Sequence, residues 1–224
     1  RMRGHENRVY GKQGSELQQR CAAEGFSYTP VPFRRYYSPS TLGFVARTLR
    51  ADRPDALVCW DQHAVRVGAV AAALLGKQRP RVVYYQGLEG SFANKPYNRL
   101  VTAPRIDLII ANAQSIVDEL RAFGWIPEGR LSLIYDGVDP TPILNADPGG
   151  VRPSLGYGEN EVLGLVVARL VSEKGHALLL DVLPEVLRRH PEFRLLVAGT
   201  GPEEERLRAQ IERLGLGEGV QLLG

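Results

Sequence analysis

The segment from Arg169 to Gly175 places two cations where an anionic ligand would bind. Arg169 directly follows the apolar run at 162–168, which indicates a buried strand, and Lys174 precedes an amphipathic helix predicted for 177–189. Ligands of open α/β sheets bind at the carboxyl ends of strands. Unpaired N–H groups at the helix start and the missing side chain of Gly175 would admit a phosphate. The residues favour a diphosphate site, and a surface Arg and Lys beside an ordinary loop is the open alternative.

A second glycine-containing loop, Gly199-Thr200-Gly201, follows the strand predicted at 193–198. A strand, a Gly-x-Gly turn and a helix also open dinucleotide sites, but the third glycine of that pattern is missing here. We expect the loop to line the nucleotide site, with the glycines making room for the ligand. A tight turn that touches no ligand is the alternative.

Polar residues also follow two predicted strands of the front half. Asp61 and His63 come after the run at 57–60, and Gln86 and Glu89 come after the run at 82–85. At a carboxyl-terminal edge these side chains are candidates for contact with an acceptor or a donor sugar. No group of His, Cys, Asp or Glu has metal-ligand spacing, so we expect neither a metal nor another cofactor.

The elements that must position these residues alternate along the chain. The alternation predicts an α/β fold of parallel, Rossmann-like sheets. Ser115, with Asp118 three residues later, resembles a capping box, Gly124 supplies a helix stop, and Pro184 predicts a kink or a restart. The predicted strands are 57–60, 82–85, 108–111, 131–135, 162–168, 193–198 and 220–223, and the predicted helices are 41–51, 65–75, 116–123, 177–189 and 203–214.

The region from Asp139 to Gly156 is rich in Pro and Gly and favours neither strand nor helix. We therefore divide the chain into a first domain at 1–139, a linker at 140–158 and a second domain at 159–224.

The amino-acid composition limits the classes of protein to which the chain can belong. Hydrophobic residues make up 44% and charged residues 24%, as in average globular proteins, and no apolar run is long enough to span a bilayer. Cys21 and Cys59 are the only cysteines, and we interpret them as structural thiols in a reducing compartment, which favours the cytoplasm.

Charge is uneven along the chain. Residues 1–110 hold 17 Lys and Arg against 8 Asp and Glu, whereas residues 111–224 hold 11 against 17. A basic front half suits an anionic partner, and the run Phe33-Arg34-Arg35-Tyr36-Tyr37 suits sugar stacking or peripheral contact with an anionic cytoplasmic membrane. An ordinary solvated surface is the alternative, and no motif supports nucleic-acid binding.

Four motifs resemble, in the right order, segments of the family 4 (group 1) glycosyltransferases. Ala168 to Gly175 resembles "G-R-L-x-x-x-K-G", and Leu195 to Pro202 resembles "L-x-I-x-G-x-G-P". Val220 to Gly224 resembles "V-x-F-L-G", and Tyr135 to Asp139 resembles "P-N-G-V-D".

The resemblance implies a GT-B fold, in which two Rossmann-like domains face a cleft. Arg169 and Lys174 would be catalytic, neutralising the diphosphate of a nucleotide-sugar donor, and Gly175, Gly199 and Gly201 would line the donor site. Asp61, His63, Gln86 and Glu89 would lie on the side of the acceptor, whether a lipid, a saccharide or a small molecule. The resemblance further implies retention of anomeric configuration without a metal.

The sequence also departs from the family. Gln86-Gly87 stands where many members carry His-Gly, and a glutamine can hydrogen-bond a hydroxyl but cannot act as acid or base. Members begin with a strand and glycine-rich loop before the segment at Gly4, and they carry a glutamate pair beyond the position of Gly224. We therefore expect both domains to be truncated and this fragment itself to be inactive and prone to aggregate.

Three other classes remain as alternatives. A sugar-nucleotide epimerase or phosphorylase shares the expected fold, and a non-catalytic sugar-binding module could keep it. A dinucleotide oxidoreductase is disfavoured because no complete Gly-x-Gly-x-x-Gly follows a predicted strand.

Overall fold

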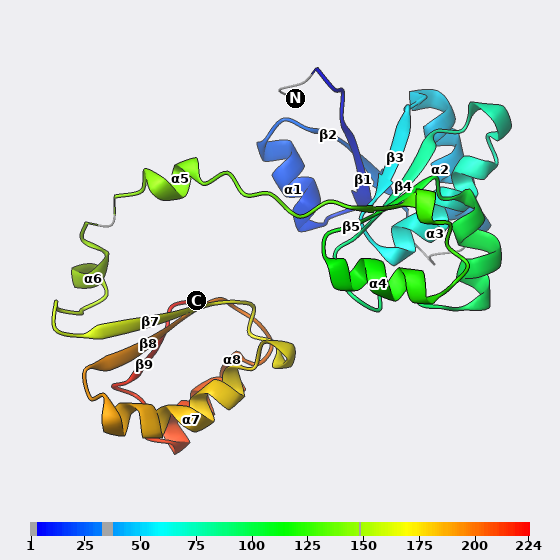
Figure 1. Ribbon diagram of the computed structural model, residues 1–224. Helices are drawn as coiled ribbons and strands as arrows, with labels where there is room; N and C mark the ends of the chain where they lie inside the picture. The colour runs from blue at the N-terminus through cyan, green and yellow to red at the C-terminus, as the bar shows by residue number, and fades with distance from the viewer. Residues whose placement is uncertain (1–3, 33–37, 148) are drawn as a thin grey trace. The chain divides into compact units, whose positions relative to one another are not determined.

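The computed structural model describes residues 4–32, 38–147 and 149–224, which form two compact units, Arg1–Val138 and Asp139–Gly224 (Figure 1). In both units the paired strands are parallel, so the predicted α/β class with parallel sheets is confirmed. The basic-aromatic run at 33–37 lies outside the described residues.

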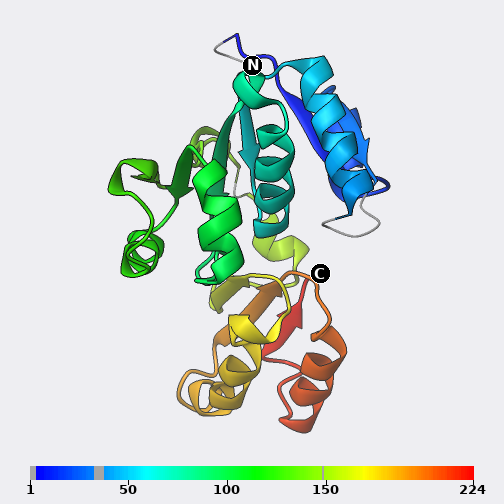
Figure 2. The same cartoon turned by 90° about the vertical axis from the view of Figure 1, so that its right-hand side faces the viewer.

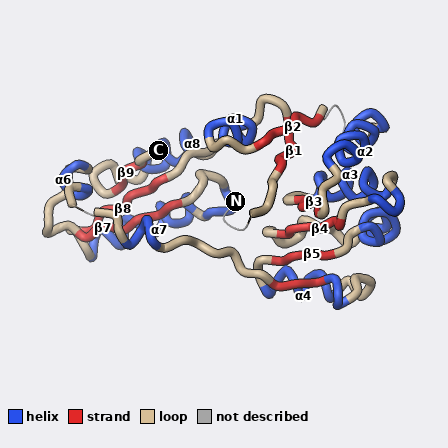
Figure 3. The backbone as a smooth tube through the Cα atoms, turned by 90° about the horizontal axis from the view of Figure 1, so that it is seen from above, coloured by secondary structure: helices blue, strands red, loops and turns tan. Residues whose placement is uncertain are grey.

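Unit 1 contains a two-stranded sheet, β1-β2, and a four-stranded sheet of order β3-β4-β5-β6 (Figure 3). A π-helical turn, Asn98–Thr102, and 3₁₀ turns at Gly76–Gln78, Ala103–Arg105 and Glu128–Arg130 lie in the connections. The elements are β1 (Arg8–Lys12), α1 (Glu16–Ala23), β2 (Ser27–Val31), α2 (Pro39–Asp52), β3 (Ala56–Cys59), α3 (Gln62–Ala73), β4 (Arg81–Gln86), β5 (Leu108–Ala111), α4 (Gln114–Ala122) and β6 (Leu131–Leu133).

The core of unit 1 lies where α3 and α4 pack on the four-stranded sheet, and α2 packs on α3 (Figure 2). Alternate residues of β4, Val82 and Tyr84, face this core and are buried, as period-2 geometry requires of a strand covered on one side. Val65 of α3 and Leu120 of α4 pack against them in the same cluster. Cys59 is a buried free thiol of this core, and burial raises its pKa to about 12.

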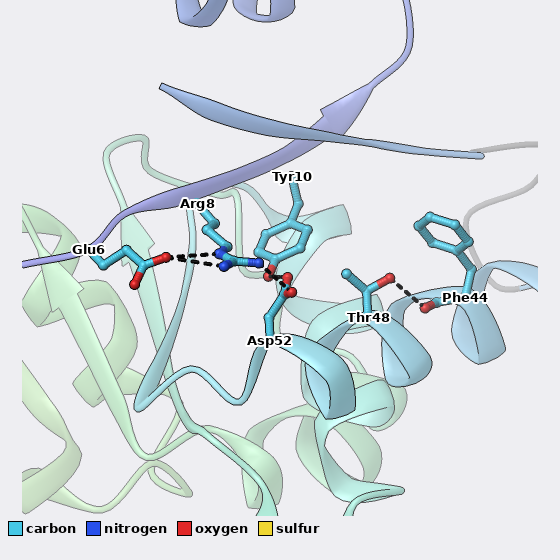
Figure 4. A network of polar contacts seen from close by, with 6 residues as sticks. All are labelled: Glu6, Arg8, Tyr10, Phe44, Thr48 and Asp52. Atoms are coloured by element: carbon cyan, nitrogen blue, oxygen red, sulfur yellow. Dashed lines mark hydrogen bonds and ion pairs between the residues drawn. The ribbon is translucent and has the colours of Figure 1, made fainter. Parts of the chain in front are cut away.

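A polar network ties β1 to the end of α2 (Figure 4). The Nη1 of Arg8 donates to Oδ1 of Asp52 over 2.6 Å, and the hydroxyl of Tyr10 donates to Oδ2 of the same carboxylate over 2.6 Å. Burial and the bond to Asp52 raise the pKa of the Tyr10 phenol. Glu6 also accepts from the Arg8 guanidinium. The two-stranded sheet is thereby held to the rest of unit 1.

Unit 2 contains a three-stranded parallel sheet of order β7-β8-β9, and α7 and α8 pack on one face of it. Leu183 of α7, Leu195 of β8 and Leu207 of α8 meet in its core. The elements are α5 (Thr141–Leu144), α6 (Val151–Ser154), β7 (Val162–Val167), α7 (His176–Arg189), β8 (Phe193–Ala198), α8 (Glu204–Arg213) and β9 (Val220–Leu222), with a 3₁₀ turn at Ser172–Lys174.

Three local predictions were wrong. Ser115 is not a cap, because α4 begins at Gln114 after the extended Ala113, and Ser115 already lies in the first turn. The predicted restart at Pro184 is also wrong, because α7 continues through this residue, which removes only one helical hydrogen bond while Leu180 and Leu183 are held in the core. The predicted kink stays a prediction.

The third wrong prediction is that the region from Asp139 to Gly156 forms no helix, because it contains the short helices α5 and α6. Pro142 and Pro153 each lie in the first turn of their helix, where a backbone N–H has no helical acceptor to lose. Gly124, by contrast, ends α4 as predicted, with φ +69° and its N–H donating to Arg121 O over 3.0 Å.

None of the described helices has the length and hydropathy that crossing a bilayer requires.

Candidate functional site

The backbone around Arg169 is held against the loop that follows β8. Leu170 N donates to Thr200 O over 2.9 Å, and Glu203 N donates to Leu170 O over 3.1 Å. The Leu170 side chain is 1% exposed and belongs to the core of unit 2. Arg169 itself is exposed. A fixed backbone therefore presents an exposed cation at the carboxyl end of β7.

Gly199 and Gly201 make this close approach of two loops feasible. A Cβ on Gly199 would lie 2.0 Å from Ala168 O, and a Cβ on Gly201 would lie 2.3 Å from Leu170 O. Any side chain would therefore push the Arg169 backbone away. Packing within the chain accounts for both glycines, and their contact with a nucleotide stays a prediction.

Lys174 and Gly175 form the approach to α7. Lys174 is exposed at the end of the 3₁₀ turn, and Gly175 has φ +71°, a left-handed conformation that favours glycine. No atom of the described residues lies within 4 Å of a Cβ built on Gly175, so the backbone is open on that side. Among those residues no side chain caps α7, whose first turn carries the positive end of the helix dipole.

The two sides of this segment are anchored in the core. Leu170 fixes its beginning, and His176, which is also buried, fixes its end. The structure therefore gives Arg169 and Lys174 a common, rigid frame at the junction of a strand end and a helix start. Chemically, this arrangement of two cations and a helix dipole suits a bound anion with more than one negative group.

Among the residues predicted to contact an acceptor, Asp61 caps a helix. Its Oδ1 accepts from the N–H groups of His63 over 2.7 Å and Ala64 over 2.9 Å, which caps α3. Glu89 is exposed in the loop after β4. Contacts of Asp61, His63 or Glu89 with an acceptor stay predictions.

Gln86 is 1% exposed, because it lies on the core-facing side of β4. Its Nε2 donates to Leu88 O over 3.2 Å, and its Oε1 has no hydrogen-bond partner among the described residues. An acceptor would reach this side chain only after it was uncovered. The neighbouring Tyr85, on the opposite face of the strand, is the more accessible residue.

The structure brings together four residues that the sequence interpretation missed, from the carboxyl ends of successive strands. Trp60 follows β3, Tyr85 lies near the end of β4, Asn112 follows β5 and Asp136 follows β6. The Tyr85 hydroxyl donates to Asp136 Oδ1 over 2.5 Å, and Asn112 Nδ2 donates to Asp136 Oδ2 over 2.8 Å. The rings of Trp60 and Tyr85 have centroids 4.6 Å apart. We call these four residues the Trp60–Asp136 cluster.

Hydrogen bonding shifts the pKa values of two groups in this cluster. The bond from Tyr85, followed by that from Asn112, lowers the pKa of the Asp136 carboxyl, and the same bond raises the pKa of the Tyr85 phenol. The cluster therefore presents a stable carboxylate beside two aromatic rings. The signal in the sequence was that each of the four residues lies at or just beyond the end of a strand, and this signal does not reveal which of them meet.

Comparison with known families accounts for most of the chain. Residues 1–141 match the family described as Glycosyltransferase Family 4, and residues 151–224 match that described as Glycosyl transferases group 1.

Two curated relatives illustrate the similarity. Over 98% of its length the chain is 30% identical to the GDP-mannose-dependent alpha-(1-6)-phosphatidylinositol monomannoside mannosyltransferase of Mycolicibacterium smegmatis, and it covers 59% of that protein. Over 34% of its length it is 40% identical to a subunit of the phosphatidylinositol N-acetylglucosaminyltransferase of Arabidopsis thaliana, and it covers 16% of that protein. The chain thus spans only part of each relative.

Solved structures share the fold. Anabaena HepE in complex with UDP aligns with a TM-score of 0.76 at 23% identity, over 97% of this chain and 61% of that one. A glycosyltransferase from Rickettsia africae aligns with a TM-score of 0.79 at 17% identity, over 100% and 61%. The UDP-N-acetylglucosamine 2-epimerase of Rickettsia bellii also aligns, with a TM-score of 0.55 at 16% identity, over 96% and 61%. These likenesses confirm the GT-B fold class, which both transferases and epimerases adopt.

Proposed function

The chain belongs to the family 4, group 1 glycosyltransferases, and from this premise we propose that its protein moves a sugar from a nucleotide-diphosphate-sugar to an acceptor, with retention of anomeric configuration. The Anabaena structure that contains UDP supports a nucleotide donor. Membership of the family favours transfer over the epimerase or phosphorylase alternative, which fold similarity alone leaves open.

Arg169 and Lys174 carry the chemistry of this proposal. As the bond between the sugar and the diphosphate breaks, negative charge grows on the departing diphosphate, and fixed cations stabilise that charge more than the ground state. The first turn of α7 adds its N–H groups and the positive end of its dipole. These groups supply the positive charge that a metal ion would otherwise provide, so we propose transfer without a metal.

The observation that supports this role most directly is the rigid frame of the segment. Leu170, between the two exposed cations, and His176, just after them, are buried, and the backbone at Leu170 is hydrogen-bonded at both N–H and C=O. A preorganised frame means that little reorganisation is needed when charge develops.

The acceptor is proposed to be lipid-linked or another carbohydrate-like molecule. The names of the Mycolicibacterium and Arabidopsis relatives both contain phosphatidylinositol, which supports a lipid that bears a cyclic polyol. The basic front half, with 17 Lys and Arg against 8 Asp and Glu in residues 1–110, would favour peripheral contact with an anionic cytoplasmic membrane. Sedimentation with vesicles of anionic and of neutral lipid checks this, and equal binding to both would contradict it.

The function is tested with the protein expressed from its complete reading frame. UDP- and GDP-linked sugars are offered with and without membrane lipids, and release of nucleotide diphosphate and appearance of glycosylated product are measured. We expect product with one donor class and an unchanged anomeric configuration by NMR. Interconversion of the donor sugar with no transferred product would favour the epimerase instead.

A further inference from the structure

The Trp60–Asp136 cluster is an aromatic and polar surface that plays no part in the diphosphate mechanism proposed above. Trp60 is 69% exposed, although a side chain of this size is normally covered. Its ring lies against that of Tyr85 at an interplanar angle of 48°. The pair therefore offers a broad apolar surface at the carboxyl edge of the four-stranded sheet, the edge at which α/β sheets bind ligands.

Hydrogen bonds hold the polar half of this surface in place, and some of its hydrogen-bonding positions remain unused. A carboxylate can accept about four hydrogen bonds, and the structure gives Asp136 one from Tyr85 and one from Asn112. Asn112 retains its amide oxygen as an acceptor. Acceptors of this kind, held in place, match the hydroxyl groups of a sugar.

Gly87 keeps this arrangement open. A Cβ at that position would lie 3.1 Å from the Tyr85 ring and 3.5 Å from Asn112 Nδ2. A larger residue would crowd the two side chains that hold the Asp136 carboxylate. Packing within the cluster thus explains why the residue that follows β4 has no side chain.

We propose that the Trp60–Asp136 cluster binds the carbohydrate or cyclic polyol ring of the acceptor, with the apolar face of the ring on Trp60 and its hydroxyls on Asp136 and Asn112. This inference rests on the proposed transfer function. The four side chains contain a carboxylate and no cation, so the cluster selects a neutral polyhydroxy ring and not a phosphate. The hydrogen bonds from Tyr85 and Asn112 hold the Asp136 carboxylate in place as an acceptor for hydroxyl groups, which gives it a positioning task.

Tryptophan fluorescence tests the binding directly, because Trp60 and Trp125 are the only tryptophans in residues 1–224. In the full-length protein Trp125→Phe leaves Trp60 as the sole tryptophan of these residues, and any tryptophan outside them is replaced in the same way. The probes are methyl α-glucoside, myo-inositol and glycerol. We expect a saturable change of emission with a cyclic probe and none with acyclic glycerol, and at least a ten-fold weaker response in Asp136→Asn.

A kinetic experiment separates this site from the donor site. In Trp60→Ala we expect at least a ten-fold rise in KM for the acceptor, with unchanged affinity for the nucleotide donor and partial recovery in Trp60→Phe. The exposed Leu74→Ala serves as the matched control for loss of surface apolar area and should behave as wild type. An unchanged acceptor KM, or a lowered melting temperature with no change in ring binding, would show that the surface packs against protein and would overturn the proposal.

The two proposals fail in different ways. A wild-type protein that turns over no nucleotide sugar would contradict the transfer function, while the fluorescence titration would still decide whether the ring binds. A protein that transfers sugar but shows no response of Trp60 would retain the function and contradict the site.

Discussion

The carbonyl oxygen of Ala168 occupies the space that a side chain on Gly199 would need, since a Cβ built there would lie 2.0 Å away. The residue next to Ala168 is Arg169, so the same contact that excludes a side chain also sets the path of the backbone that carries the cation. The Gly-x-Gly loop and the basic segment are thus one structural unit.

Gly199→Ala should therefore destabilise unit 2 and displace Arg169 together. Gly199 has φ +147°, so strain adds to the clash, and we expect a loss of about 2–4 kcal/mol. Urea unfolding measures the stability and calorimetry measures affinity for nucleotide diphosphate. Gly217→Ala, with no atom within 4 Å of its Cβ, is the control. Equal stability of the two variants would contradict the contact.

Gly175→Ala should destabilise unit 2 less than Gly199→Ala does, because the space beside Gly175 is open and only its φ of +71° is unfavourable. The expected loss is about 1–2 kcal/mol in thermal or urea unfolding. Gly175→Asn should recover part of that loss, since asparagine tolerates the left-handed region better. If alanine and asparagine were both neutral, the left-handed start of α7 would not be needed.

Acid should lower the folding stability of unit 1 because it protonates the Asp107 carboxylate. Its carboxylate accepts from Arg79 Nη2 over 2.7 Å and from Val82 N over 2.7 Å, and the Arg79 bond in particular lowers its pKa. A lowered folded pKa stabilises the fold above the unfolded value, and this contribution is lost as pH falls below about 4. Unfolding midpoints of wild type and Asp107→Asn should converge towards low pH.

The same pair of proteins gives the size of the effect near neutral pH. There Asp107→Asn should be less stable by about 1–3 kcal/mol, because it removes bonds to a charged group. Glu159→Gln, an exposed carboxylate of unit 2, is the control and should unfold as wild type does. A constant difference between wild type and Asp107→Asn from pH 7 to about pH 3 would contradict this origin.

Chelation should leave the reaction unchanged. If Arg169, Lys174 and the first turn of α7 supply the positive charge for the diphosphate, then transfer needs no divalent ion. Initial rates are compared after dialysis against EDTA and after return of Mg²⁺ or Mn²⁺. A loss of more than about ten-fold that either ion restores would contradict metal-free transfer.

The sequence predicted the buried elements well and the half-exposed ones poorly. Strands β5 and β8 have the predicted bounds because their residues are mostly apolar and the sequence changes composition at their ends. Strand β2 escaped prediction because it is short, half exposed and contains Pro30, which weakens any apolar pattern.

The candidate site likewise contains some residues that could be predicted from the sequence and others that could not. Arg169 and Lys174 could be found because they are close in sequence and flank one strand end and one helix start. The Trp60–Asp136 cluster could not, since Tyr85 and Asp136 are 51 residues apart and meet only through the register of three strands. Within β4, alternation decides that Gln86 is buried and Tyr85 is not, and sequence alone did not reveal which face was covered.

The central claim, that Arg169 and Lys174 neutralise the donor diphosphate, is tested most directly by the rate of transfer in the double variant Arg169→Ala, Lys174→Ala of the full-length protein. The matched control is Arg188→Ala, Arg189→Ala, which removes the same charge from the other end of α7. We predict that the first variant loses at least about 100-fold in kcat, given the usual effect of losing one preorganised donor, while the control stays within about two-fold of wild type. Equal rates in the two double variants would contradict the claim.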